Sequence, residues 1–223
     1  MSAGRSRVPV VRLTGTVAAL LGWSAVVVPA LPGAPGIRTA ANLAGVAVLV
    51  AATRAAGYGW RELGVSRTTW RRGLRWGSGA LLVVGGVYGV ALAVPALYGL
   101  LEDEAVAAMP AGEVVVRALV LIPLGTVLCE ELAIRGVLSA VAARALPQPA
   151  ALVVTAVVFG LWHLVPAYRD GGAGEAVAAV AVTTLGGLVF GLLRQRSGSV
   201  LAPMGLHLGT NSLGLLAVVL HQR

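Results

Sequence analysis

Seven long apolar runs, separated by short polar segments, divide the chain. A helix needs roughly 20 apolar residues to cross a hydrocarbon core about 30 Å thick, and only helices or closed barrels satisfy every backbone polar group in lipid. The ten-residue alternation that marks a membrane β-barrel is absent from the sequence. The pattern therefore predicts an all-α fold, a polytopic transmembrane helical bundle of about seven spans. The expected spans are 13–31, 40–53, 77–100, 114–142, 149–168, 176–193 and 199–220, of which the second is the shortest.

The segments between the runs predict how the helices are connected. Four connections are short and rich in Gly, Pro or charged residues, at 32–38, 144–148, 169–175 and 194–198. Neighbouring helices should therefore pack antiparallel. We expect two parts, N-terminal spans at 1–111 that include a basic cytoplasmic loop at 54–75, and a core of later spans at 112–223.

The composition agrees with a protein that lies in lipid. Hydrophobic residues make up 57% of the chain and charged residues 12%, against roughly 25% charged residues in soluble domains. The formal net charge of +8 comes from 17 arginines, nine of which lie in the 54–75 loop or, as Arg5, Arg7 and Arg12, before the first run. This positive-inside pattern explains the charge without a nucleic-acid partner. We expect a multi-pass protein of the bacterial plasma membrane with a cytoplasmic N-terminus, an uncleaved first span, and an external C-terminus.

Ionisable and amide side chains deep in the apolar runs single out three spans. Such groups cost several kcal/mol unless they face the protein interior or a water-filled cavity. Glu130 lies 17 residues before Pro147 and His163 lies 16 residues after it, so both should lie at nearly the same depth, about 25 Å along the helices from that turn. The residues expected to converge are Glu130, Glu131 and Arg135 in the fourth span, His163 in the fifth, and His207 and Asn211 in the last.

Spacing within the fourth span predicts which of its charged groups pair. Residues four positions apart share a helix face, so Arg135 should neutralise and fix Glu131. Glu130, turned about 100° away, then remains for chemistry, because a buried carboxylate beside a histidine can act as a general base toward water.

Smaller features of these spans have structural interpretations. Pro166 removes the helical hydrogen bond to the Trp162 carbonyl, and Pro123 removes the one to the Leu119 carbonyl. We expect kinks at both prolines, which can also open a water cavity. Cys129 is expected to be a small packed residue rather than a nucleophile.

The three segments, read in order, resemble the membrane-embedded CAAX protease and bacteriocin-processing family, also described as the type II CAAX prenyl endopeptidases. The motifs that carry the resemblance are Glu-Glu-x-x-x-Arg from Glu130 to Arg135, Phe-x-x-x-His from Phe159 to His163, and His-x-x-x-Asn from His207 to Asn211. The segment from Phe190 to Pro203 also looks like the family's link between the second and third motifs. The resemblance covers residues 112–216, while the earlier spans match only as generic apolar helices.

The resemblance implies an intramembrane endopeptidase that hydrolyses peptide bonds of membrane-associated substrates, prenylated ones included. Glu130 and His163 would activate water, while His207 and Asn211 would polarise the scissile carbonyl and stabilise its oxyanion. Supporting roles would fall to Glu131, Arg135 and Phe159. The partners implied are the lipid bilayer and a peptide or lipidated-peptide substrate.

The sequence leaves the metal and two other functions open. Glu130, His163 and His207 form a workable zinc set with water in the fourth position, and the family is often labelled metalloprotease. We prefer a metal-free mechanism with no cofactor, because His-Glu-x-x-His is absent. A proton-coupled transporter would also bury Glu and His, although here they cluster at one site. A non-catalytic membrane binding or bacteriocin self-immunity protein on the same fold is the other alternative.

Overall fold

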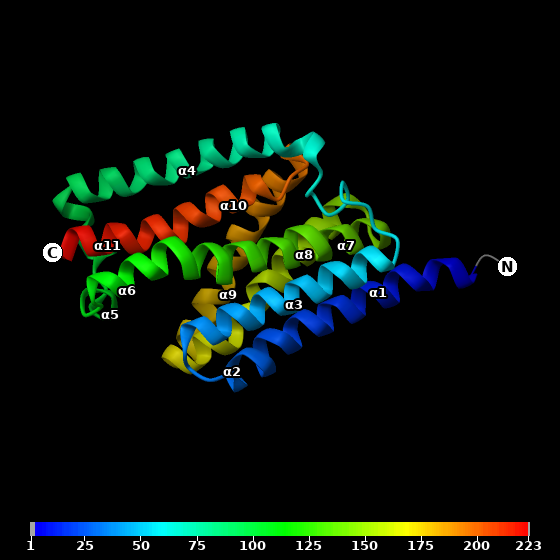
Figure 1. The fold of residues 1–223 in the computed structure, drawn as a ribbon, viewed down its shortest axis with the longest axis horizontal. Helices are drawn as coiled ribbons and strands as arrows, with labels where there is room; N and C mark the ends of the chain where they lie inside the picture. The colour runs from blue at the N-terminus through cyan, green and yellow to red at the C-terminus, as the bar shows by residue number, and fades with distance from the viewer. Residues whose placement is uncertain (1–2, 223) are drawn as a thin grey trace.

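The computed structural model describes residues 3–222, with side chains from residue 7 onward, and the elements in that range are helical (Figure 1). The α-helices are α1 (Ala3–Gly22), α2 (Val28–Ala30), α3 (Pro35–Ala55), α4 (Trp70–Ala93), α5 (Glu104–Ala107), α6 (Ala111–Val116), α7 (Ser139–Ala145), α8 (Gln148–Trp162), α9 (Leu164–Ser197), α10 (Leu201–Leu208) and α11 (Gly214–Gln222). The π-helices are η1 (Trp23–Val27), η4 (Arg117–Leu128), η5 (Glu131–Leu138) and η6 (Gly209–Leu213), and the 3-10 helices are η2 (Arg67–Thr69) and η3 (Pro95–Leu101). The predicted all-α bundle is confirmed.

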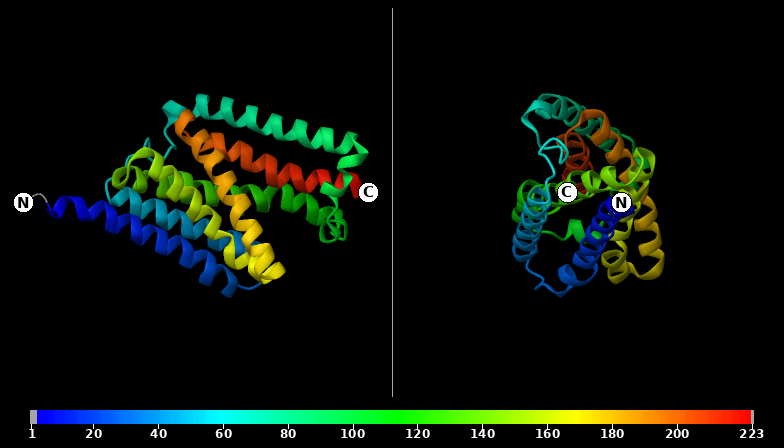
Figure 2. Two further views of the ribbon diagram at one scale, coloured as in Figure 1. Left: turned by 180° about the vertical axis from the view of Figure 1, so that it is seen from behind. Right: turned by 90° about the vertical axis from the view of Figure 1, so that its right-hand side faces the viewer.

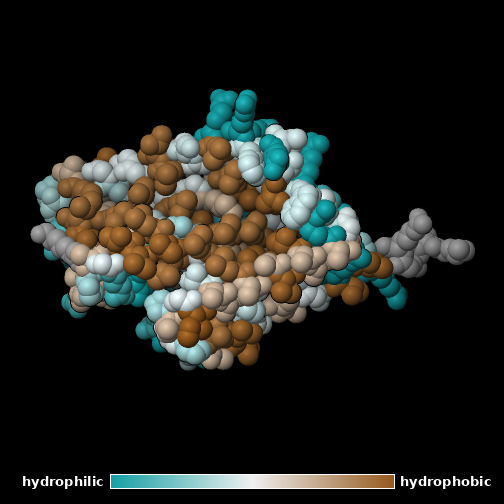
Figure 3. All heavy atoms as spheres, in the orientation of Figure 1, coloured by the Kyte–Doolittle hydropathy of each residue, from teal (hydrophilic) through white to brown (hydrophobic). Residues whose placement is uncertain are grey.

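The described helices are built to face lipid. Within residues 3–222, six are long and apolar enough to cross a membrane, namely Arg7–Ala30, Pro35–Ala55, Arg67–Ala93, Ala111–Ala145, Leu164–Ser197 and Leu201–Gln222. Large apolar side chains such as Leu82, Val87 and Val182 are exposed on them. A broad hydrophobic band covers the face shown in Figure 3. The chain is an integral, multi-pass membrane protein.

The fifth expected span, 149–168, differs most from its prediction. Helix α8 has 15 residues and rises about 22 Å, less than the roughly 30 Å hydrocarbon core. The chain bends at His163 and continues into α9, which reverses direction at Gly172, where φ is 75° and ψ is −162° (Figure 2). The descending leg is therefore completed by the start of α9, and the predicted turn at 169–175 contains this glycine.

Two earlier spans also have different limits from those expected. The second is longer, because Pro35 begins α3 and the helix continues to Ala55. The third begins at Trp70 and ends at Ala93, directly before the extended Val94 and Pro95. Arginine side chains can reach the membrane surface while their stems lie along an apolar helix, so the basic residues that follow Trp70 do not prevent a helical start there.

Helices α8 and α9 pack antiparallel through small residues. A side chain at Gly160 would meet Thr184, one at Gly187 would meet Ala156, and one at Gly191 would meet Leu152. Along this series of contacts the residue numbers in α8 fall while those in α9 rise, so the two helices run antiparallel. Such close approach of backbones is how helices associate in lipid, where the hydrophobic effect does not drive them together.

Helix α4 packs parallel to the C-terminal helix for the same physical reason. A Cβ at Gly205 would meet the Gly77 backbone, one at Gly73 would meet Ser199, and one at Gly209 would meet Val84. Position numbers now rise together along both helices. The chain therefore reaches the same end of the bundle at the end of α4 and at the C-terminus (Figure 1).

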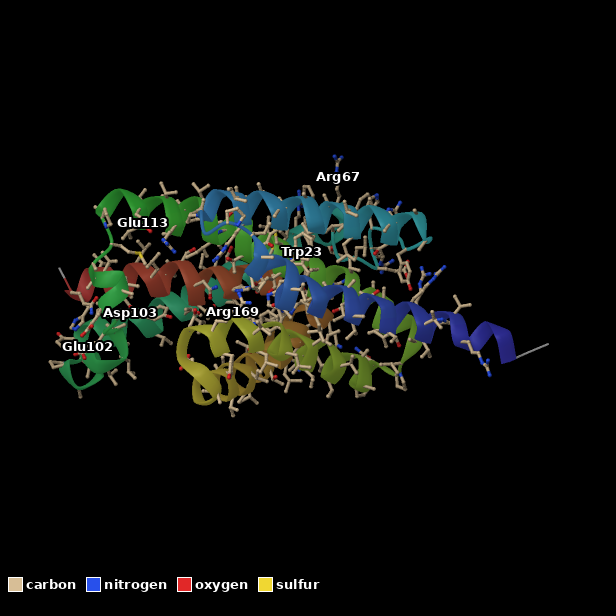
Figure 4. All side chains as sticks on the ribbon, turned by 90° about the horizontal axis from the view of Figure 1, so that it is seen from below. Trp23, Arg67, Glu102, Asp103, Glu113 and Arg169 are labelled. Atoms are coloured by element: carbon tan, nitrogen blue, oxygen red, sulfur yellow. The ribbon has the colours of Figure 1, made fainter. Side chains whose placement is uncertain are left out.

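Basic and acidic segments lie at opposite ends of the bundle. Arg12 Nη1 donates to the Ala56 carbonyl at 3.3 Å, which places α1 beside the basic loop. At the other end, Figure 4 shows Glu102, Asp103 and Glu113 near the C-terminal helix. This separation is what positive-inside orientation requires, and the cytoplasmic assignment stays a prediction. The Arg5 side chain and Arg223 lie outside the described residues.

Candidate active site

Five of the predicted site residues lie on or beside π-helical turns, namely Glu130, Glu131, Arg135, His207 and Asn211. Glu131 begins η5, and Asn211 lies within η6. Two side chains donate to carbonyls five positions earlier, Cys129 Sγ to Leu124 at 3.1 Å and Ser139 Oγ to Ile134 at 2.9 Å. Wide turns of this kind are rare and often occur at functional sites. They rotate the side chains that follow relative to a regular α-helix.

A buried network of three charged or titratable side chains forms the centre of the site. Arg135 Nη1 donates to Glu131 Oε1 at 3.2 Å, as the spacing predicted, and His207 Nδ1 lies 2.9 Å from the same oxygen. Glu131 and Arg135 are 0% and 1% exposed. Because the carboxylate oxygen accepts from Arg135 and has no proton to donate, the ring proton of His207 belongs on Nδ1.

Two phenylalanines enclose the guanidinium of this network. The Arg135 Cζ atom lies 3.9 Å from the Phe159 ring centroid and 4.8 Å from that of Phe190. The Phe190 ring also lies 5.2 Å from the His207 ring. Phe159 was predicted to support the site, but Phe190 was not selected as a site residue. Its only signal in the sequence was its place in the link between the second and third motifs.

Glu130 is the carboxylate that the network leaves free. Its side chain is 12% exposed, and its Oε2 lies 3.9 Å from His207 Nε2. That oxygen is buried and has no hydrogen-bond partner among the described residues. A distance beyond about 3.5 Å between two polar atoms is one that a water molecule can bridge.

His163 occupies the bend between α8 and α9. Its Nδ1 lies 2.8 Å from the Phe159 carbonyl. A carbonyl only accepts, so Nδ1 donates and Nε2 of the neutral ring carries a free lone pair. The Trp162 carbonyl that Pro166 frees accepts a hydrogen bond from Ser24 Oγ. His163 makes no hydrogen bond or ion pair with Glu130 among residues 7–222. The histidine that lies within 4 Å of a Glu130 oxygen is His207 instead.

Asn211 presents an amide donor on the same helix as His207. Its side chain is half-buried, and its Oδ1 accepts a hydrogen bond from Thr210 Oγ1 at 3.2 Å. The amide nitrogen therefore has donors to offer, which is the property that oxyanion stabilisation needs.

Comparison with protein families identifies this part of the chain. Residues 111–213 match the family model described as type II CAAX prenyl endopeptidase Rce1-like. Over this segment the chain is similar to that family. The Rce1-like segment begins with α6 and ends in η6, so it contains each of the seven residues proposed for the site. No curated protein and no solved structure matches the chain.

The N-terminal spans support the Rce1-like segment through polar contacts that sequence reasoning missed. Trp23 Nε1 donates to Asn42 Oδ1 at 3.0 Å, and Asn42 Nδ2 donates to the Gly125 carbonyl at 3.0 Å. An amide inside the apolar run 40–53 was the available signal, because such a group in lipid needs a partner. The contact binds the second span to the π-helical part of the fourth.

An apolar cavity lies beside the site, between the N-terminal spans and the Rce1-like segment. Its volume is about 480 Å³, and its lining includes Trp23, Asn42, Cys129, Ala133 and Trp162. Cys129 adjoins Glu130 in sequence, and Trp162 adjoins His163. Cys129 itself is 5% exposed, in agreement with the predicted packing role.

The metal that the family label suggests was tested against the geometry of the donors. Among residues 3–222 no group of three His, Cys, Asp or Glu side chains is arranged to hold a metal ion. Glu130, His163 and His207 are therefore not assembled as a zinc set here. Glu131, the other nearby carboxylate, already accepts from Arg135 and His207. We derive no step through a metal.

Proposed function

We propose that this chain is an intramembrane endopeptidase in which Glu130 activates water to hydrolyse a peptide bond of a membrane-associated substrate. The match of residues 111–213 to the Rce1-like family model supports a CAAX-type protease in general terms. The observation that carries the specific proposal is the free Glu130 Oε2, 3.9 Å from His207 Nε2. A buried carboxylate without a protein partner is costly, and a reactive water would satisfy it.

The proposed reaction begins with water held between Glu130 Oε2 and His207 Nε2. Glu130 takes one proton from the water molecule. At the same time the water oxygen attacks the scissile carbonyl carbon and forms a tetrahedral intermediate. When this collapses, the carbon–nitrogen bond breaks, and Glu130 passes the proton to the leaving amine. The products are a carboxylic acid and an amine, and the carboxylate is restored.

The other motif residues have supporting roles in this proposal. The Asn211 amide donates to the oxyanion, since a correctly placed donor is worth about 10²–10³ in rate. The His163 Nε2 lone pair can accept a proton from water or substrate, which keeps its predicted part in water activation open to experiment. Glu131 fixes the His207 ring through Nδ1, and Arg135 holds Glu131 in place.

The surroundings of the site favour a substrate that approaches from the lipid. The apolar cavity between α1, α3 and the Glu130 helix offers a surface for an extended peptide or its lipid group. Membrane-associated peptides are therefore the proposed substrate class, with prenylated peptides the first to test. We propose that the basic end of the bundle, with the N-terminus, faces the cytoplasm.

The test uses the full chain in proteoliposomes with quenched-fluorescent peptides, prenylated and unmodified. Glu130→Gln should lower kcat/KM by about 10³-fold or more, because it keeps the shape of the side chain but removes the base. Glu113→Gln is the matched control, since Glu113 is a half-exposed glutamate at the outer end of the same long helix. His163→Ala tests the second proposed base.

Four outcomes decide the proposal. Loss of cleavage in Glu130→Gln at unchanged thermal stability, with an active Glu113→Gln control, supports it. Equal cleavage by wild type and Glu130→Gln would show that the base is misassigned. If a chelator abolished wild-type cleavage and zinc restored it, the metal-free part would be wrong while the peptidase assignment stood. Absence of cleavage from all peptides, with specific peptide binding retained, would favour the non-catalytic binding protein.

A further inference from the structure

The basic end of the bundle contains a pocket whose chemistry the peptidase reaction does not use. It has a volume of about 290 Å³ and lies between the loop after α3 and the turn that joins α9 to α10. Four of its lining residues are Arg61, Arg72, Arg194 and Arg196, and no carboxylate lines it. A dense group of cations without a carboxylate beside it attracts anions from outside the protein.

Three of these guanidinium groups are free to bind a ligand. Those of Arg61, Arg72 and Arg196 make no hydrogen bond or ion pair within the part of the chain that the structure describes, and all three side chains are exposed. Arg194 differs, because its Nε donates to the Arg135 carbonyl at 3.0 Å and its Nη2 donates to the Glu62 carbonyl at 2.7 Å. Arg194 therefore holds the wall of the pocket in place.

A groove continues from this pocket into the hydrophobic zone. Its volume is about 830 Å³, and it shares Thr68 and Arg72 with the pocket. Beyond Arg72 it runs along Trp76, Gly79 and Val83, which lie at helical spacing on one face of α4. Leu193 of α9 forms the opposite wall. One end of the continuous space is cationic and the other is apolar.

The position of the groove matches the membrane surface. Trp70 and Trp76 are exposed near the start of α4, and tryptophan is enriched where lipid headgroups begin. Figure 3 shows hydrophilic side chains gathered over the start of α4, directly beside the apolar surface of the bundle. The guanidinium group of arginine can donate two hydrogen bonds to the oxygens of one phosphate group. An acyl chain would fit the apolar end of the groove.

We propose that this pocket and groove form a binding site for one anionic glycerophospholipid, with its phosphate on Arg61, Arg72 and Arg196 and an acyl chain along α4 beside Trp76. Basic pockets between membrane helices on the cytoplasmic side are the usual places for such headgroups. Neither Glu130 nor His207 lines this site, so the lipid-binding proposal can be tested independently of the peptidase activity.

The chain offers a matched control for the headgroup contacts. Arg67 belongs to the same basic segment but lines neither cavity, and Figure 4 shows it projecting away from the bundle. Arg67→Gln and Arg72→Gln remove the same charge from neighbouring positions. Non-specific attraction between a basic surface and anionic lipid would be weakened equally by both, whereas a built site is weakened by Arg72→Gln alone.

The acyl groove has its own matched pair on α4. A side chain added at Gly79 meets no atom within 4 Å, and the same is true at Gly86. The Cβ of Gly79→Leu therefore has open space, and the leucine side chain would occupy the groove. Gly86→Leu adds the same side chain to the same helix outside the groove.

The experiment titrates the full chain in neutral detergent with phosphatidylglycerol or phosphatidylcholine of equal chain length and counts bound lipid by native mass spectrometry. The first phosphatidylglycerol should bind wild type more tightly than phosphatidylcholine, and Arg72→Gln and Gly79→Leu should each weaken it about fivefold or more. The two control variants should bind like wild type. Thermal unfolding of each variant checks that it is folded.

Three results would overturn the proposal. Equal weakening by Arg67→Gln and Arg72→Gln would show a diffuse electrostatic effect. Equal binding of phosphatidylcholine would show an apolar groove without headgroup recognition. Competition by glycerophosphate, which has no acyl chain, at the same concentration as the lipid would show a site for free phosphate esters.

Discussion

Two Glu–Arg pairs at the same spacing lie on one long membrane helix, and they differ in almost every physical property. Glu113 and Arg117, the outer pair, are 2.8 Å apart near the N-terminal end of that helix, with side chains 43% and 37% exposed. Glu131 and Arg135 are 3.2 Å apart in the middle of the span, with side chains 0% and 2% exposed. The sequence gives both pairs the same i,i+4 order, so spacing alone cannot tell which belongs to a site.

The difference teaches that burial, rather than pairing, marks the chemical centre. The outer pair is more than a third exposed, so water or lipid headgroups can reach and screen it. The inner pair is enclosed by Phe159, Phe190 and His207, so each charge depends on its partner. A network of this kind costs free energy to build, and it is retained where its geometry has a use.

The largest predicted effect is a loss of stability when the glutamate of the inner pair, and not that of the outer pair, is removed. Glu131→Ala leaves the Arg135 guanidinium buried without its carboxylate, which should lower the free energy of unfolding by about 3–5 kcal/mol. Glu113→Ala removes an exposed partner and should change it by less than about 0.5 kcal/mol. Thermal or denaturant unfolding in detergent measures both.

A double variant in the same experiment shows whether the loss of stability comes from leaving one buried charge without its partner. Replacing both buried charges, as Glu131→Leu with Arg135→Met, should recover much of the lost stability, because neither charge is then left alone. Activity should not return, since His207 has lost the group that fixes its ring. Equal destabilisation by Glu131→Ala and Glu113→Ala would show that the inner pair is as well solvated as the outer one.

A smaller loss of stability is predicted when one of the two phenylalanine rings around Arg135 is removed. Within the described residues, no aromatic ring lies over the guanidinium of the outer pair. Phe190→Leu keeps an apolar side chain but removes one of the two rings that face Arg135, and a desolvated cation–π contact is worth about 2 kcal/mol. We expect a loss of about 1–2 kcal/mol in stability, with kcat reduced because Phe190 also packs against His207. Tyr168→Leu, at an exposed aromatic residue on the same helix, is the control and should be neutral.

Much of the fold and part of the site could be predicted from the sequence. Apolar runs of sufficient length define the spans, because a bilayer imposes that length. The Glu131–Arg135 contact followed from helical spacing and is confirmed. The catalytic roles of Glu130, His163, His207 and Asn211 stay predictions, to be decided by the cleavage assay.

What could not be predicted depends on helix rotation and on apolar neighbours. The closest carboxylate to His207 is that of Glu131 and not that of Glu130. Both glutamates lie where a π-helix begins, and spacing rules for a regular α-helix do not anticipate how such a turn rotates them. Phe190 is apolar, and hydropathy does not distinguish a ring that faces lipid from one that covers Arg135. The bend at His163 likewise ended α8 earlier than its apolar run suggested.

The smallest predicted effect comes from a third pair, which is exposed like the outer pair but fixed by better geometry. Glu62 binds Arg144 through two hydrogen bonds of 2.8 Å each, while the two side chains are 41% and 37% exposed. The hydrogen bond from Arg144 lowers the pKa of Glu62 below its ordinary value of 4.5. A lowered pKa in the folded state means that the pair stabilises the protein above about pH 4.5 and that this contribution is lost as the pH falls.

The measurement compares thermal unfolding of wild type and Glu62→Gln between pH 7 and pH 3.5. Wild type should be the more stable at pH 7 by less than about 1 kcal/mol, because solvent screens an exposed pair, and the two curves should converge as Glu62 gains its proton. High salt should reduce the difference at pH 7. Parallel curves at all pH values would show that Glu62 acts through its shape and not its charge. A loss of stability in Glu62→Gln as large as that in Glu131→Ala would contradict the role given to burial. Hydrogen-bond geometry, and not burial, would then set the strength of these pairs.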